Sequence, residues 1–205
     1  MTKPDYEQAQ AYAARRLKSE LPSTSYYHSA GHTLDDVLPA AARLAEIEGI
    51  KGDELLCLLT AACFHDIGHI EQSKNHEQIS VRIASEVLPG FGYSPQQIEL
   101  ISSLIMATKV PQHPATLLER IIVDADMDSL GRDDFLRVSR ALRDELAATG
   151  IHYTDAEWYQ YQIEFLEEHH YFTQAARTLR DEGKQRNLAL LHRLLDDSRN
   201  HDARQ

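Results

Sequence analysis

Apolar residues recur along the chain at the three- and four-residue spacing of amphipathic helices, and no stretch sustains the alternation typical of strands. The pattern predicts an all-α fold, a single helical bundle of about nine helices. These are expected at residues 5–20, 30–48, 53–68, 75–88, 95–109, 115–129, 132–148, 155–169 and 174–196. Because the sequence has no repeat and no linker, we expect one domain over residues 1–197 and a polar tail over 198–205.

Several predicted helix ends have local sequence support. Ser94 with Gln97, and Thr154 with Glu157, have the spacing of a capping box, in which side chains and backbone of the first turn exchange hydrogen bonds. Glycine or proline follows several of the helices, as is usual at a helix C-terminus. Pro39 falls inside the second predicted helix, so it should kink that helix or reset its start.

The composition excludes some classes of partner. The chain has 32 acidic residues against 21 Lys and Arg, a formal charge of −11, and no basic stripe, so duplex nucleic acid is not expected as a partner. The two cysteines, Cys57 and Cys63, lie in an apolar run, which predicts buried free thiols in a reducing compartment. Without a signal peptide or a bilayer-spanning run, we expect a cytoplasmic protein with no membrane contact. Apolar faces of late helices leave a homo-oligomer open.

The eleven histidines are the unusual number, since histidine is the commonest transition-metal ligand. His28 and His32 are four residues apart and would share one helix face. The pair His65-Asp66 ends a strongly apolar helix, and His69 follows four residues after His65. A lone histidine is usually a surface or structural residue. Here, however, the position of the pair in an apolar helix favours a functional role.

Asp124 and Asp126 likewise follow an apolar helix directly, where a carboxylate is rarely found unless it is paired or ligated. Two imidazoles and two carboxylates, completed by water, suit a divalent ion such as Mn²⁺, Mg²⁺, Fe²⁺, Zn²⁺ or Co²⁺. The pattern lacks nearby thiolates, which disfavours a structural zinc site. Coordination positions left to water instead indicate hydrolysis by a metal-activated water.

In this order the motifs resemble those of the HD superfamily of metal-dependent phosphohydrolases, whose members are all-α. The resemblance spans most of residues 24–195. The segments that carry it are Tyr27-His28-x-x-x-His32, His65-Asp66-Ile67-Gly68-His69, Asn75-His76-Glu77 and Asp124-Ala125-Asp126-Met127-Asp128. The first two are similar to motifs of class I cyclic-nucleotide phosphodiesterases. The resemblance implies hydrolysis of a small phosphoester, a nucleotide or cyclic-nucleotide phosphodiester.

The same resemblance implies roles for individual residues. Asp66 matches a carboxylate that can bridge two ions, so the cofactor would be one or two divalent ions. His28 matches the residue that protonates the leaving oxygen, and His69 matches a histidine beside the metal-bound water and the phosphate. The implied metal ligands are His32, His65, Asp66 and Asp126. Two alternatives stay open, an exchange of roles between His28 and His32 and the replacement of Asp126 by Asp124.

Lys109 and His113 follow a predicted helix and are candidates for holding the phosphate, against the alternative that they are ordinary loop residues. The main alternative to an enzyme is a nucleotide-binding regulatory module with a slow or vestigial site. A di-iron oxygenase on the same scaffold is a further alternative. It would need extra histidine ligands, for which His76 and His113 are the candidates.

Overall fold

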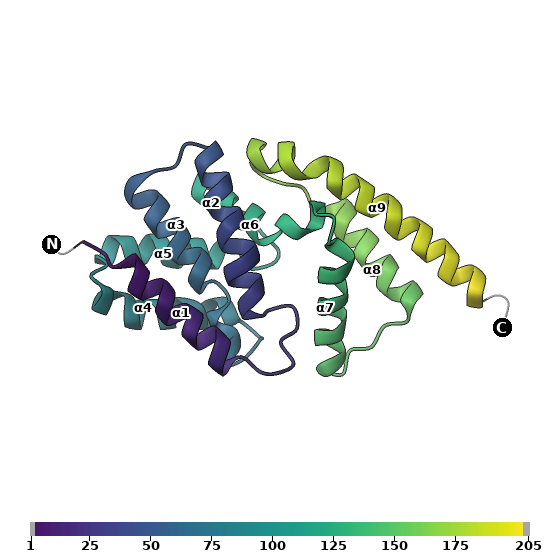
Figure 1. Cartoon of the computed structure of the whole chain (residues 1–205), viewed down its shortest axis with the longest axis horizontal. Helices are drawn as coiled ribbons and strands as arrows, with labels where there is room; N and C mark the ends of the chain where they lie inside the picture. Colours follow the sequence, from purple (N-terminus) through teal and green to yellow (C-terminus); the bar gives the residue numbers. More distant parts are fainter. Residues whose placement is uncertain (1–2, 203–205) are drawn as a thin grey trace. The chain divides into compact units, whose positions relative to one another are not determined.

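The computed structural model describes residues 3–202, and this part of the chain is all-α with nine α-helices, as the sequence predicted (Figure 1). The chain divides into two compact units, of which the first ends at Met127 and the second begins at Asp128. The sequence predicted one continuous domain. The division falls just after a helix, where no Pro-, Gly- or Ser-rich linker marks it, so composition gave no signal of it.

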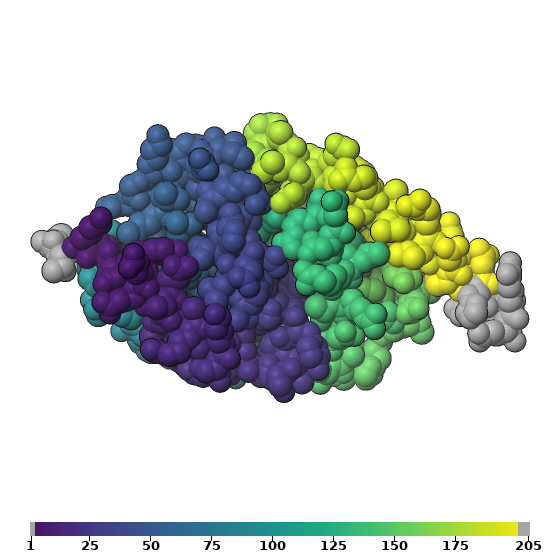
Figure 2. Space-filling view, in the orientation of Figure 1, coloured from purple at the N-terminus to yellow at the C-terminus, as the bar shows by residue number. Residues whose placement is uncertain are grey.

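The first unit is built around α3, which packs on α1, α2 and α5. Helix α1 lies at the surface of the unit in Figure 2 and buries Ala9, Ala13 and Leu17 on its inner side. The elements of this unit are α1 (Tyr6–Glu20), η1 (His32–Val37), α2 (Leu38–Ile47), α3 (Gly52–Phe64), η2 (Ile67–Ile70), α4 (His76–Val87), η3 (Leu88–Phe91), α5 (Pro95–Ala107) and α6 (Leu117–Asp126).

Pro39 resets the start of the second predicted helix. Residues 32–37 form a π-helical turn, η1, and α2 begins at Leu38 with Pro39 in its first turn. Proline is tolerated there because the first turn of a helix has no internal partner for its N–H groups. His32 therefore lies on a wide turn of the kind that is frequent at functional sites.

Both predicted capping boxes are present. The Gln97 N–H donates to Ser94 Oγ at 3.3 Å, and the Glu157 N–H donates to Thr154 Oγ1 at 3.3 Å. In each box the third-position side chain accepts a hydrogen bond from the backbone of the cap residue. A third capping box, which was not predicted, is formed by Thr116 and Glu119 at the start of α6.

Both cysteines are buried and free, as predicted. The Sγ of Cys63 lies 3.9 Å from the Tyr6 hydroxyl, and burial raises the pKa of the Cys63 thiol to about 12. With such a pKa the Cys63 thiol is protonated at neutral pH. Among the described residues, no helix combines the length and the apolar character needed to cross a bilayer.

The second unit packs its longest helix, α9, against α8 and against the short turn η4. Helix α9 continues past residue 196, so residues 198–202 of the expected polar tail are helical, and residues 203–205 lie outside the described part. The elements of this unit are η4 (Asp128–Gly131), α7 (Phe135–Ala148), α8 (Asp155–Glu168) and α9 (Gln174–Asp202).

Helix α9 meets η4 at two glycines. A Cβ on Gly183 would lie 1.9 Å from the Gly131 carbonyl oxygen, and a Cβ on Gly131 would lie 2.4 Å from the Arg180 carbonyl oxygen. Beside this crossing the Arg180 guanidinium binds both oxygens of buried Asp128, at 2.8 and 2.9 Å. The backbones approach too closely for any larger residue at either glycine.

We expect Gly183→Ala to destabilise the protein. In an ordinary helix interior this change stabilises by about 1 kcal/mol, but here the added methyl group meets backbone, so we expect a loss of about 1–3 kcal/mol. The loss is measured as a lower midpoint of thermal unfolding by circular dichroism. Gly90→Ala is the control, because a Cβ there would meet nothing within 4 Å. An unchanged or higher midpoint for Gly183→Ala would contradict this packing.

Candidate metal centre

The His65-Asp66 pair lies where α3 ends, in the interior of the first unit. His65 is 0% exposed and Asp66 is 4% exposed, because the last residues of α3 are core residues that carry the pair inward. The Nδ1 of His65 is 2.9 Å from the Ala62 carbonyl oxygen. In the neutral ring this hydrogen bond places the proton on Nδ1, and Nε2 keeps the lone pair that a metal needs.

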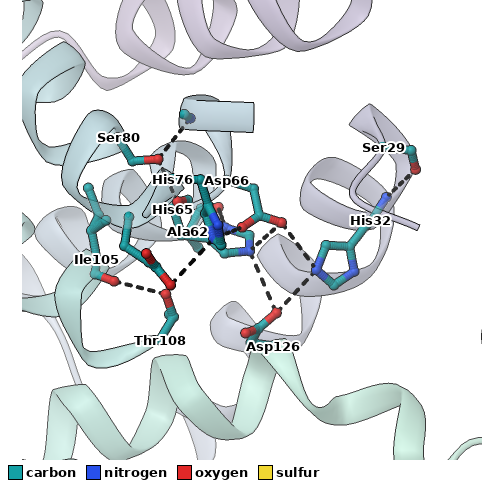
Figure 3. A network of polar contacts seen from close by, with 12 residues as sticks. Ser29, His32, Ala62, His65, Asp66, His76, Ser80, Ile105, Thr108 and Asp126 are labelled. Carbon is teal, nitrogen blue, oxygen red and sulfur yellow. Dashed lines mark hydrogen bonds and ion pairs between the residues drawn. The ribbon is translucent and has the colours of Figure 1, made fainter. Parts of the chain in front are cut away.

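Ser80 of α4 holds the turn that follows the pair. Its hydroxyl donates to the His65 carbonyl at 2.6 Å and accepts from the Gly68 N–H at 2.8 Å (Figure 3). A Cβ on Gly68 would lie 2.0 Å from the His76 carbonyl oxygen, so only glycine lets α4 come this close. The sequence predicted no role for Ser80, because its two hydrogen-bond partners, His65 and Gly68, lie 15 and 12 residues earlier in the chain and reach it only through tertiary packing.

The four expected ligands come together from three separate segments, η1, the end of α3 and the end of α6 (Figure 3). His32 Nε2 lies 3.1 Å from Asp126 Oδ1 and 3.6 Å from Asp66 Oδ2. His65 Nε2 lies 3.3 Å from Asp66 Oδ2 and 3.6 Å from Asp126 Oδ1. Ligand atoms of His32, His65 and Asp66 all lie within 4.8 Å of one another.

Two atoms at the centre of this cluster have unused bonding capacity. His65 Nε2 and Asp66 Oδ2 are buried, and neither makes a hydrogen bond with any residue that the structure describes. Leaving buried polar atoms in this state is costly, and an ion is one of the recognised explanations. Two imidazole nitrogens and two carboxylates without a thiolate form a donor set that fits a divalent ion.

Electrostatic coupling within the cluster is strong. Burial acts to lower the pKa of His65, but the carboxylates of Asp66 and Asp126 outweigh it and raise that pKa well above its ordinary value. Burial acts to raise the pKa of Asp66, yet His65 and His76 hold it well below its usual range. The carboxylates therefore stay negative, and the attraction that holds a proton on His65 can hold a divalent cation instead.

Three more histidines surround the other side of the Asp66 carboxylate. His76 Nε2 lies 3.3 Å from Asp66 Oδ1, while its Nδ1 is 3.0 Å from the Ser73 carbonyl oxygen. The ring of His69 stacks on that of His28, with centroids 4.1 Å apart, and lies 3.9 Å from that of His76. His28, Asp66 and His69 form a second group whose ligand atoms lie within 4.8 Å of one another.

The structure also shows where the alternative ligands lie. Asp126 has the carboxylate that contacts His32 and His65, and Asp124 is buried within α6 at 1% exposure. His32 is grouped with His65, whereas His28 is grouped with His69. The placement thus favours Asp126 and His32 as ligands.

A cavity of about 290 Å³ opens at the cluster. Asp66 and Asp126 both line it, together with His28, His76 and Lys109. Of the two candidate phosphate-binding residues, Lys109 therefore lies at the cavity. The other, His113, is exposed in the loop between α5 and α6 and does not line the cavity.

The fold and the site define an all-α domain with a His-Asp cluster suited to a divalent metal. Residues 30–129 match the family model of the HD domain, and this segment contains all four expected ligands. This segment therefore belongs to the HD domain family. No curated protein matches the chain.

Two solved structures share this fold. One is Bacillus subtilis YpgQ in complex with ADP, with a TM-score of 0.67 and 18% identity over 94% of this chain and 97% of that one. The other is a predicted HD superfamily hydrolase from an uncultured Thermotogales bacterium, with a TM-score of 0.62 and 20% identity over 95% of this chain and 93% of that one.

We expect the protein to bind Mn²⁺ at this cluster and Asp66→Ala to weaken binding by at least about 100-fold, because loss of even a supporting group at a metal site costs about 10–100-fold. Equilibrium dialysis against Mn²⁺, with the metal quantified by mass spectrometry, measures this. Asp53→Ala is the matched control, since Asp53 is an exposed acid in the first turn of α3. Equal Mn²⁺ affinities for Asp66→Ala and Asp53→Ala would mean that the metal binds outside this cluster.

Proposed function

We propose that this protein is a divalent-metal-dependent phosphohydrolase that acts on a small nucleotide or cyclic nucleotide. The observation that carries the proposal is the cavity of about 290 Å³. Two expected metal ligands, Asp66 and Asp126, line this cavity together with Lys109. A metal ion and a lysine together would make the electrostatic potential in the cavity positive, although the formal charge of the protein is −11. An anionic phosphoester could then bind despite the overall charge.

The fold neighbours support the same substrate class. YpgQ was solved in complex with ADP, so a protein of this fold accommodates a nucleotide. Membership of residues 30–129 in the HD domain family supports phosphoester hydrolysis as the reaction.

A divalent ion bound by His32, His65, Asp66 and Asp126 would supply Lewis-acid polarisation of a phosphoryl oxygen and a lowered pKa for a bound water. Side chains of the protein would bind the phosphate and donate the proton. Lys109 lines the cavity and would pair with a phosphate oxygen. His28 lines it too and, as imidazolium, would give its proton to the departing oxygen.

The position of His28 depends on its ring contacts. It stacks on His69 at 4.1 Å, with an angle of 17° between the rings, and the Tyr27 ring packs edge-on against it at 4.7 Å. His69 is itself 4% exposed. We therefore assign His69 to holding the His28 ring against the cavity.

The direct test is a screen of the Mn²⁺-loaded protein against nucleoside monophosphates and triphosphates, cyclic nucleotides and bis(p-nitrophenyl) phosphate. We expect hydrolysis of at least one class, and Asp66→Ala should abolish it while Asp53→Ala leaves it unchanged. The physical reason is that Asp66 contacts both His32 and His65 and lines the cavity. Tight nucleotide binding without turnover would instead favour a regulatory module.

A second test isolates His28. If His28 protonates the leaving oxygen, His28→Gln should lower kcat about 10²–10⁴-fold for a nucleotide ester whose leaving group is a poorly stabilised alkoxide. The same variant should change kcat little for a p-nitrophenyl ester, whose leaving group departs without a proton. His192→Gln, an exposed histidine of α9, is the control. Equal losses with both leaving groups would rule out proton donation by His28.

A further inference from the structure

The cavity at the metal cluster is not lined by polar groups alone. Three of its lining side chains are apolar or aromatic, namely Tyr27, Val110 and Met127. They come from three different places in the first unit, the segment before η1, the loop between α5 and α6, and the residue after α6. We call them the apolar wall of the cavity. Tyr27 also packs on the His28 ring, but neither metal binding nor phosphate binding needs the side chains of Val110 and Met127.

Val110 is the most informative of the three. It is 61% exposed, the highest value among the large apolar residues that are exposed in the described part of the chain. Single exposed apolar residues are normal on a protein surface and need no explanation by themselves. Val110, however, lines the cavity directly beside Lys109, so a phosphate held by that lysine would bring its organic substituent close to an uncovered valine.

The size of the cavity leads to the same conclusion. Pockets that enclose a whole small-molecule ligand usually measure about 300–1,000 Å³, and this cavity is at the lower limit with about 290 Å³. A phosphate and the atoms next to it fill part of such a space. The rest of a nucleotide would therefore extend along the lining toward the exposed side chain of Val110.

We propose that the apolar wall holds the organic group of the substrate, and that Val110 determines the preference for a phosphoester carrying an uncharged ring, such as a nucleobase. This assignment rests on the proposed phosphohydrolase function and adds the substrate feature that it selects. Rings pack well against aromatic and aliphatic surfaces, and covering Val110 removes apolar area from water. Metal content and phosphate affinity should not depend on it.

The test uses two ligands with a carbon–phosphorus bond, which cannot be hydrolysed as an ester. One is the adenosine phosphonate in which CH₂ replaces the 5′ oxygen, and the other is methylphosphonate, which has no ring. Dissociation constants are measured by isothermal titration calorimetry on the Mn²⁺-loaded wild type and on Val110→Ser, Val110→Leu and Ile47→Ser. Ile47 is the matched control, since it is 56% exposed at the end of α2 and does not line the cavity.

We expect the wild type to bind the adenosine phosphonate at least about tenfold more tightly than methylphosphonate. Val110→Ser should lower this ratio about three- to tenfold, as expected for losing part of a buried valine, while its affinity for methylphosphonate and its Mn²⁺ content stay unchanged. Val110→Leu and Ile47→Ser should keep the wild-type ratio.

Two results would overturn the assignment while leaving phosphate hydrolysis intact. One is a wild type that binds both phosphonates equally. The other is a Val110→Ser variant that keeps the full ratio, or that loses affinity for both ligands to the same extent. If the wild type bound neither phosphonate, the proposed function itself would fail, and the assignment of the apolar wall would fail with it.

Discussion

The buried carboxylate of Asp66 is the group on which the rest of the first unit depends. A carboxylate that is 4% exposed is costly unless positive charge and hydrogen-bond donors surround it. Histidine nitrogens lie within 3.6 Å of the carboxylate on both sides. His32 and His65 face Oδ2, and His76 faces Oδ1. Buried nitrogen and oxygen atoms of the cluster nevertheless make no hydrogen bond. These atoms can still coordinate a divalent cation, which the atoms of a fully hydrogen-bonded ion-pair network could not do.

The surrounding fold keeps this arrangement in place. The apolar helix α3 brings His65 and Asp66 into the interior, and Ser80 ties the following turn to α4 through two hydrogen bonds. The π-helical turn before α2 carries His32, and the last residue of α6 carries Asp126. Ligands from separate segments thus meet only when these helices are packed, so metal binding and the native fold of this unit should stabilise each other.

Much of this could be predicted from the sequence, because helical periodicity, capping boxes and a buried His-Asp pair are local signals. The helices, the caps at Ser94 and Thr154, and the reset at Pro39 follow from them. Three features depend on tertiary packing and could not be predicted. They are the division into two units at Met127, the role of Ser80, and the placement of Val110 at the cavity while His113 stays outside it. A loop residue shows no periodicity that tells which way it will face.

The central claim is that His32, His65, Asp66 and Asp126 hold a divalent metal at the base of the cavity. Anomalous diffraction from crystals grown with Mn²⁺ tests it most directly, because the signal locates the ion without reference to activity. The account predicts a peak bonded to His32 Nε2, His65 Nε2, Asp66 Oδ2 and Asp126 Oδ1, at metal–ligand distances of about 2.0–2.4 Å. A fully loaded crystal with no peak there, or with its only strong peak away from these four residues, would contradict it.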